Sequence, residues 1–139
     1  MDFDTAFDRL IGFEGGVSNN PQDPGGLTKY GISQKAFPNV DIANLTLEQA
    51  KAIYKAQYWD AIRADTLPDV LRYVAFDAAV NSGVNRSNVW LQLALSGNPE
   101  PYQALARFVG YRLKFMASLS TWSTFGKGWT LRNADILTK

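Results

Sequence analysis

Apolar residues recur at helical spacing at the start of the chain. Residues 2–13 place large apolar side chains close to a period of 3.6 residues, and two aspartates stand at the end where the helix dipole favours acids. This pattern predicts an amphipathic helix. We expect it to end at Glu14, because Gly15 and Gly16 follow.

The pattern changes over residues 15–33, where no helical period is visible. This stretch of nineteen residues holds five glycines, two prolines and two asparagines. Such a composition is typical of turns. We therefore expect an irregular segment with a ribbon of small strands around residues 27–32.

Helical patterns return and fill the rest of the chain. Thr46 and Gln49 form a capping box that opens a helix reaching about Trp59, and Pro68 suits the first turn of a helix that Gly83 closes. Further helices are predicted over residues 87–96, 100–118 and 127–137. The chain thus reads as one α+β domain over residues 1–139, mostly α-helical, with a motif-bearing half (1–66) and a helical half (67–139).

Composition narrows the chemistry that this domain can perform. The 139 residues include no cysteine and no histidine, which excludes Ser-His-Asp and Cys-His nucleophilic sites and every Cys/His zinc site. Nor do the carboxylates show a clustered spacing that suits a metal ion. We therefore expect no metal and no other cofactor, and any catalysis should depend on carboxylates.

The charge distribution bears on possible partners. The net charge is only +1, which argues against a nucleic-acid partner, although residues 1–66 carry nine acids and six bases whereas residues 67–139 carry four acids and eight bases. No apolar run approaches the ~20 residues of a membrane span, so no membrane insertion is expected. The acidic start shows no signal-peptide core, and we expect no export by a visible signal.

Candidate chemistry is concentrated between Glu14 and Ile32. A carboxylate ends the first helix, Asp23 follows nine residues later, and Thr28 comes five residues after that. Glu14 is framed by glycines that allow close approach of a ligand, and apolar neighbours would keep its carboxyl protonated as a general acid. Asp23, in a more solvated turn, would stay ionised. Two carboxyls in contrasting environments are what cleavage of a glycosidic bond usually needs.

These residues carry a resemblance to a known family. The segments are Glu14-Gly-Gly, Asn20-Pro-Gln-Asp23-Pro, Gly25-Gly-Leu-Thr28-Lys-Tyr-Gly31-Ile, Tyr58-Trp59-Asp60, Phe76-Asp77 through Asn81-Ser-Gly83, and Phe125-Gly-Lys-Gly128-Trp129-Thr-Leu-Arg132. In this pattern the chain resembles the glycoside hydrolase family 108 muramidases, found chiefly as phage endolysins and related cell-wall lysozymes.

The resemblance implies a lysozyme-like fold with a small β-ribbon after the first helix. It implies hydrolysis of the β-1,4 bond between N-acetylmuramic acid and N-acetylglucosamine in peptidoglycan. By the family motif, Glu14 would donate the proton to the leaving oxygen. Asp23 would stabilise the oxocarbenium-like transition state or orient the attacking water, and Thr28 would hold that water.

Sugar binding needs aromatic faces and amide or carboxyl groups. On this ground we consider four further residues as candidate substrate contacts: Tyr30, Trp59, Asp77 and Asn81. Asp77 and Asn81 are four apart on one predicted helix, so they are expected to share a face that lines a groove. Trp122, Trp129 and Arg132 are expected to pack or cap the last helix rather than to contact a ligand.

Other functions and settings stay open at this point. A lytic transglycosylase would cleave the same bond by closing an anhydro ring, and a non-catalytic wall-binding virion module would keep only the fold. Peptidoglycan glycan strands are the expected partner, and the chain is expected to be a monomer or one domain of a larger virion protein. A free endolysin would wait in the bacterial host cytoplasm for a holin-like protein to give it access to the wall, whereas a virion lysin would travel with the particle.

Overall fold

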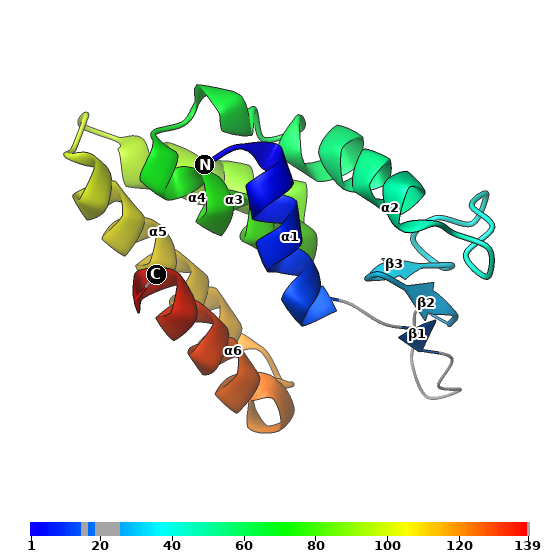
Figure 1. The fold of residues 1–139 in the computed structure, drawn as a ribbon. Coiled ribbons are helices and arrows are strands. Elements are labelled where there is room, and N and C mark those ends of the chain that lie inside the picture. The colour runs from blue at the N-terminus through cyan, green and yellow to red at the C-terminus, as the bar shows by residue number, and fades with distance from the viewer. Residues whose placement is uncertain (15–16, 19–25, 139) are drawn as a thin grey trace.

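The computed structural model describes residues 1–14, 17, 18 and 26–138, without the side chains of residues 13, 14, 17, 18 and 123. Within these residues the chain forms a mostly helical domain with a small sheet to one side of it (Figure 1). The α-helices are α1 (Phe3–Glu14), α2 (Leu47–Tyr54), α3 (Asp69–Ser82), α4 (Val84–Leu95), α5 (Pro101–Ser118) and α6 (Trp122–Thr138). The strands are β1 (Val17–Ser18), β2 (Thr28–Lys29) and β3 (Ile32–Ser33).

The sheet follows the first helix, as the sequence predicted. The three strands are antiparallel in the order β1-β2-β3. Tyr30 and Gly31 connect β2 to β3, and both have positive φ, at 51° and 77°. A two-residue loop with both residues in the left-handed region matches the right-handed twist of a hairpin. Gly31 adopts this conformation without strain, whereas Tyr30 needs support from its surroundings.

The second helix begins at the predicted capping box. The Thr46 hydroxyl accepts from the Gln49 backbone N–H at 3.1 Å, and the Gln49 side chain accepts from the Thr46 N–H at 3.0 Å. The helix continues from Tyr54 into a π-helical segment, Lys55–Trp59. The helical run therefore extends as far as predicted, to Trp59.

The core is built around α3, which contacts α1, α4 and α5. Nine of its fourteen residues are buried, so α3 is the central helix of the described domain. Phe76 packs edge-on against Phe3 and Trp59, with ring centroids 5.8 and 5.4 Å apart. This aromatic cluster joins the start of α1 to the end of the α2 run.

Two predicted helix starts are wrong. The helix predicted over residues 87–96 begins three residues earlier, at Val84, because Gly83 ends α3 and the next helix starts directly after it. The last helix begins at Trp122 rather than at residue 127. The glycine at position 126 does not break it, since the ring of Trp122 lies against this glycine where a Cβ would come within 2.7 Å. In the part of the chain that the structure describes, no helix is both long and apolar enough to cross a bilayer.

Candidate functional site

The backbone brings two of the three predicted catalytic positions to one region. Glu14 is the last residue of α1. Thr28 lies in β2, opposite Ser18 of β1, which follows Glu14 by four residues. The end of α1 and the strand that carries Thr28 are therefore joined through β1. The side chain of Glu14 and the whole of Asp23 lie outside the described residues, and their catalytic roles stay predictions.

Thr28 is half-buried and its hydroxyl is only weakly engaged. The Oγ1 atom donates to the Gly26 carbonyl at 3.4 Å, a long hydrogen bond. The oxygen keeps its capacity to accept a hydrogen bond. This geometry is compatible with the predicted role of holding a water molecule.

Tyr30 is held in its left-handed conformation by α2. The hydroxyl of the buried Tyr54 donates to the Tyr30 carbonyl at 2.6 Å. This bond ties the β2–β3 turn to the helix and supports a backbone conformation that tyrosine rarely adopts. The Tyr30 side chain keeps part of its surface exposed. Its predicted contact with sugar stays a prediction.

The predicted substrate contact of Trp59 is wrong. Its side chain has no exposed surface, and its ring packs against Phe3 and Phe76. The indole Nε1–H donates to Asp65 at 3.1 Å, which satisfies its polar atom. No face of the ring is open to a sugar, so Trp59 is a core residue.

The predicted groove position of Asp77 is also wrong. Asp77 has no exposed surface, whereas Asn81 on the same helix is exposed. The Asp77 carboxylate accepts from Arg132 Nε of α6 at 2.8 Å, and Arg112 Nη1 of α5 lies 2.6 Å from its other oxygen. Asp77 therefore connects three helices inside the domain, and only Asn81 remains as a candidate contact from this pair.

Asp77, Arg112 and Arg132 form an ion cluster that joins α3, α5 and α6. Arg9 of α1 donates to the Asp135 carboxylate of α6 at 3.0 Å, and the two helices run in opposite directions (Figure 1). Sequence reasoning assigned Arg132 only a packing or capping role and missed this cluster.

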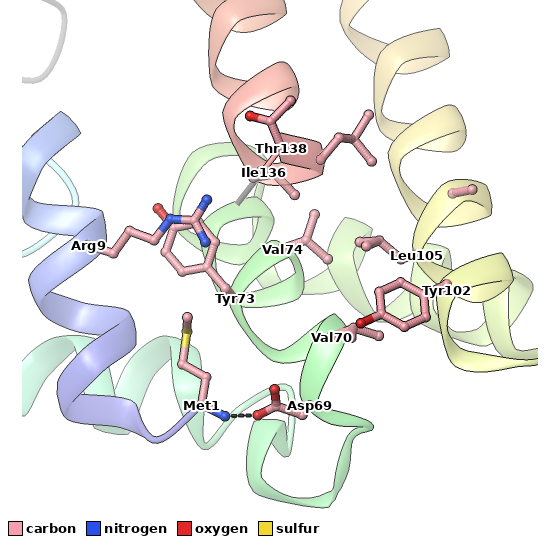
Figure 2. A pocket seen from close by; sticks show the side chains of 12 residues that line it. Met1, Arg9, Asp69, Val70, Tyr73, Val74, Tyr102, Leu105, Ile136 and Thr138 are labelled. Carbon is pink, nitrogen blue, oxygen red and sulfur yellow. Dashed lines mark ion pairs between the residues drawn. The ribbon is translucent and has the colours of Figure 1, made fainter.

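A separate pocket of about 500 Å³ lies between α1, α3, α5 and α6 (Figure 2). The Arg9 guanidinium covers the Tyr73 ring there, 4.1 Å from its centroid. Burial raises the pKa of the Tyr73 phenol well above its usual value, and the nearby Asp77 carboxylate adds to the rise. None of the predicted site residues whose side chains are described lines this pocket, so it is distinct from the predicted catalytic region.

Among the described side chains, no group of three or more carboxylates is clustered to hold a metal ion. Among the predicted catalytic and substrate-contact residues, the described side chains offer a half-buried hydroxyl at Thr28 on β2 and an exposed amide at Asn81 on α3.

Comparison with known proteins places this arrangement in a family. A family model described as glycosyl hydrolase 108 matches residues 7–83, a range that runs from α1 to the end of α3 and holds every predicted site residue. The structure is also similar to the solved structure of Brucella abortus SagA, with a TM-score of 0.86 and 28% sequence identity over 96% of this chain and 90% of that chain. No curated protein is significantly similar in sequence. The predicted lysozyme-like α+β fold is confirmed by the structural match, and because the family model covers more than half of the chain, the chain belongs to glycosyl hydrolase family 108 and is a glycoside hydrolase.

Proposed function

We propose that the protein is a muramidase that hydrolyses the β-1,4 bond between N-acetylmuramic acid and N-acetylglucosamine in peptidoglycan glycan strands. The observation that carries the proposal is the family match over residues 7–83, which includes the whole Glu14–Thr28 motif. The backbone supports it, because Glu14 ends α1 and Thr28 lies on the strand joined to that end through β1.

In the proposed reaction, the Glu14 carboxyl donates its proton to the glycosidic oxygen as the bond to the anomeric carbon breaks. The ionised Asp23 stabilises the positive charge that develops on the sugar ring, or orients the attacking water. Thr28 accepts a hydrogen bond from that water and so fixes its approach. The water oxygen then bonds to the anomeric carbon, and its proton leaves to a carboxylate or to solvent.

The products distinguish a hydrolase from a lytic transglycosylase, which cleaves the same bond. We expect digestion of purified peptidoglycan to yield reducing N-acetylmuramic acid ends, seen by mass spectrometry as products that carry one added water. A transglycosylase would instead yield 1,6-anhydro ends, which are lighter by that water. Predominantly anhydro products from the wild-type protein would refute the hydrolase proposal.

Thr28 provides a graded test of the water-holding role. Thr28→Val keeps the branched shape that suits a strand and removes the hydroxyl, so we expect kcat to fall about three- to tenfold, the worth of one hydrogen bond. Thr28→Ser restores the hydroxyl and serves as the matched control, with kcat expected near that of wild type. Equal rates for all three proteins in a turbidity assay would remove Thr28 from the mechanism.

A further inference from the structure

Tyr54 contacts both of the elements that carry described catalytic positions. It is the last residue of α2 and has no exposed surface. Its ring packs edge-on against Phe7 of α1, with ring centroids 5.5 Å apart, and α1 ends at Glu14. Its hydroxyl donates to the Tyr30 carbonyl at 2.6 Å, in the turn that directly follows the strand of Thr28. One buried side chain thus connects the helix of the predicted proton donor to the hairpin of the predicted water-holding residue.

The hairpin of β2 and β3 depends on contacts with the rest of the domain. Each strand is only two residues long, and a two-stranded hairpin is at best marginally stable by itself. At its open end the Gln34 N–H donates to the Leu27 carbonyl at 2.9 Å, and the Ile32 side chain is fully buried. At its turn, the Tyr54 hydroxyl supplies a hydrogen bond from the core. The position of the turn therefore depends on that bond as well as on the burial of Ile32.

The backbone of Tyr30 makes this bond important. Its φ of 51° lies in the left-handed region, which is costly for a residue with a large side chain. Asparagine or glycine would occupy this position of a two-residue turn at lower cost. Strained residues persist where their surroundings hold them, and they cluster at functional sites. The bond from Tyr54 is such a support.

The helix that carries Tyr54 changes its geometry directly after it. The π-helical segment Lys55–Trp59 begins there. In an α-helix, side chains five residues apart point about 140° away from each other. Tyr54 and Trp59 are both fully buried, and both rings pack against Phe76. The π-helical turn, a rare element that is frequent at functional sites, lets Trp59 enter the core while Tyr54 keeps its hydroxyl on the hairpin.

We propose that Tyr54 is a positioning residue for the hydrolysis of the glycan. Its hydroxyl holds the Tyr30 carbonyl, which keeps the β2–β3 turn against α2 and so fixes where Thr28 lies relative to the end of α1. The inference rests on the proposed function, in which Thr28 holds the attacking water. In this role Tyr54 acts on kcat through the placement of the water and leaves sugar binding unchanged.

The first test is Tyr54→Phe, which keeps the ring in the core and removes the hydroxyl. On soluble glycan strands of peptidoglycan we expect kcat to fall about three- to fivefold, the effect of one hydrogen bond, with KM within about twofold of the wild-type value. The matched control is Tyr73→Phe. Within the described part of the chain the buried Tyr73 hydroxyl has no hydrogen-bond partner, and Tyr73 lines the separate pocket, so kcat and KM should not change. A wild-type kcat for Tyr54→Phe, or a loss that lies in KM, refutes the proposal.

Two double variants test the route by which Tyr54 acts. If it acts by placing Thr28, Tyr54→Phe should have no further effect on kcat in a Thr28→Val background. If it acts by holding the left-handed turn, its effect should also disappear in a Tyr30→Gly background, because glycine adopts positive φ without support. Each double variant is compared with its own single variant, since Thr28 and Tyr30 are themselves candidate site residues. A loss that persists at full size in either background refutes the proposal.

Hydrogen exchange separates this proposal from the proposed function. Without the Tyr54 hydroxyl, the backbone amides of residues 28–33 should exchange about three- to fivefold faster than in the wild-type protein, whereas Tyr73→Phe should leave their rates unchanged. Cleavage by the wild-type protein together with an unchanged kcat in Tyr54→Phe refutes the positioning role alone. If the wild-type protein cleaves no peptidoglycan, the proposed function is refuted, and the exchange rates alone decide whether Tyr54 holds the hairpin.

Discussion

Replacing Glu14 by glutamine is expected to reduce cleavage of peptidoglycan by about 10²–10⁴-fold while the fold stays intact. An amide has nearly the shape of the carboxyl group but no acidic proton to give to the leaving oxygen. Glu14 is the last residue of α1, so the substitution changes no helix interior. The rate is measured as clearing of outer-membrane-stripped cells, and the fold by circular dichroism.

The matched control is Glu48→Gln, which makes the same chemical change at an exposed position in the first turn of α2. Glu48 lies far in sequence from the motif, and its loss should weaken only a favourable helix-dipole interaction. We expect this variant to clear cells at the wild-type rate. Clearing by Glu14→Gln at a rate near that of wild type would remove Glu14 as the proton donor.

Local signals predicted most of the fold. The sequence pair Gly15-Gly16 predicted the end of α1 at Glu14, the Thr46–Gln49 capping box predicted the start of α2, and Gly83 predicted the end of α3. Each signal acts within a few residues, so the sequence alone reveals it. The start of α6 was missed because Gly126 looks like a helix breaker until Trp122 is seen packed over it.

The site residues were predicted less completely than the fold, because the burial of two of them depends on contacts with residues distant in sequence. Trp59 ends an amphipathic run, but its burial depends on Phe3 and Phe76, from two other helices. Residues four apart on a helix differ by about 40° around its axis, enough for Asp77 to be buried while Asn81 stays exposed. The partners of Asp77 lie 35 and 55 residues further along the chain, and no local sequence pattern predicts contacts at such a separation.

The second large expected effect is a loss of stability when Asp77 is replaced. Asp77→Ala removes the carboxylate and leaves the fully buried Arg112 beside Arg132 with no compensating charge from this group. Breaking a buried ion pair in this way costs about 3–5 kcal/mol in the free energy of unfolding. We expect a loss of that size in urea unfolding followed by tryptophan fluorescence. The control is Asp60→Ala, which breaks an exposed pair with Lys55 and should cost at most about 1 kcal/mol.

Arg112 and Arg132 share the single carboxylate of Asp77. Removing the charge of Arg112 as well should therefore recover part of the stability lost in Asp77→Ala. Arg112→Met leaves Asp77 in contact with Arg132 and fills the buried volume, so it should cost less than Asp77→Ala. In the double variant Asp77→Leu/Arg112→Met, only Arg132 keeps a charge, and because its side chain is 12% exposed it can turn toward water. The double variant should therefore be more stable than Asp77→Ala, with a coupling energy of about 1–3 kcal/mol in a double-mutant cycle. Strictly additive losses would mean that Asp77 and Arg112 stabilise the domain through packing and not through their charges.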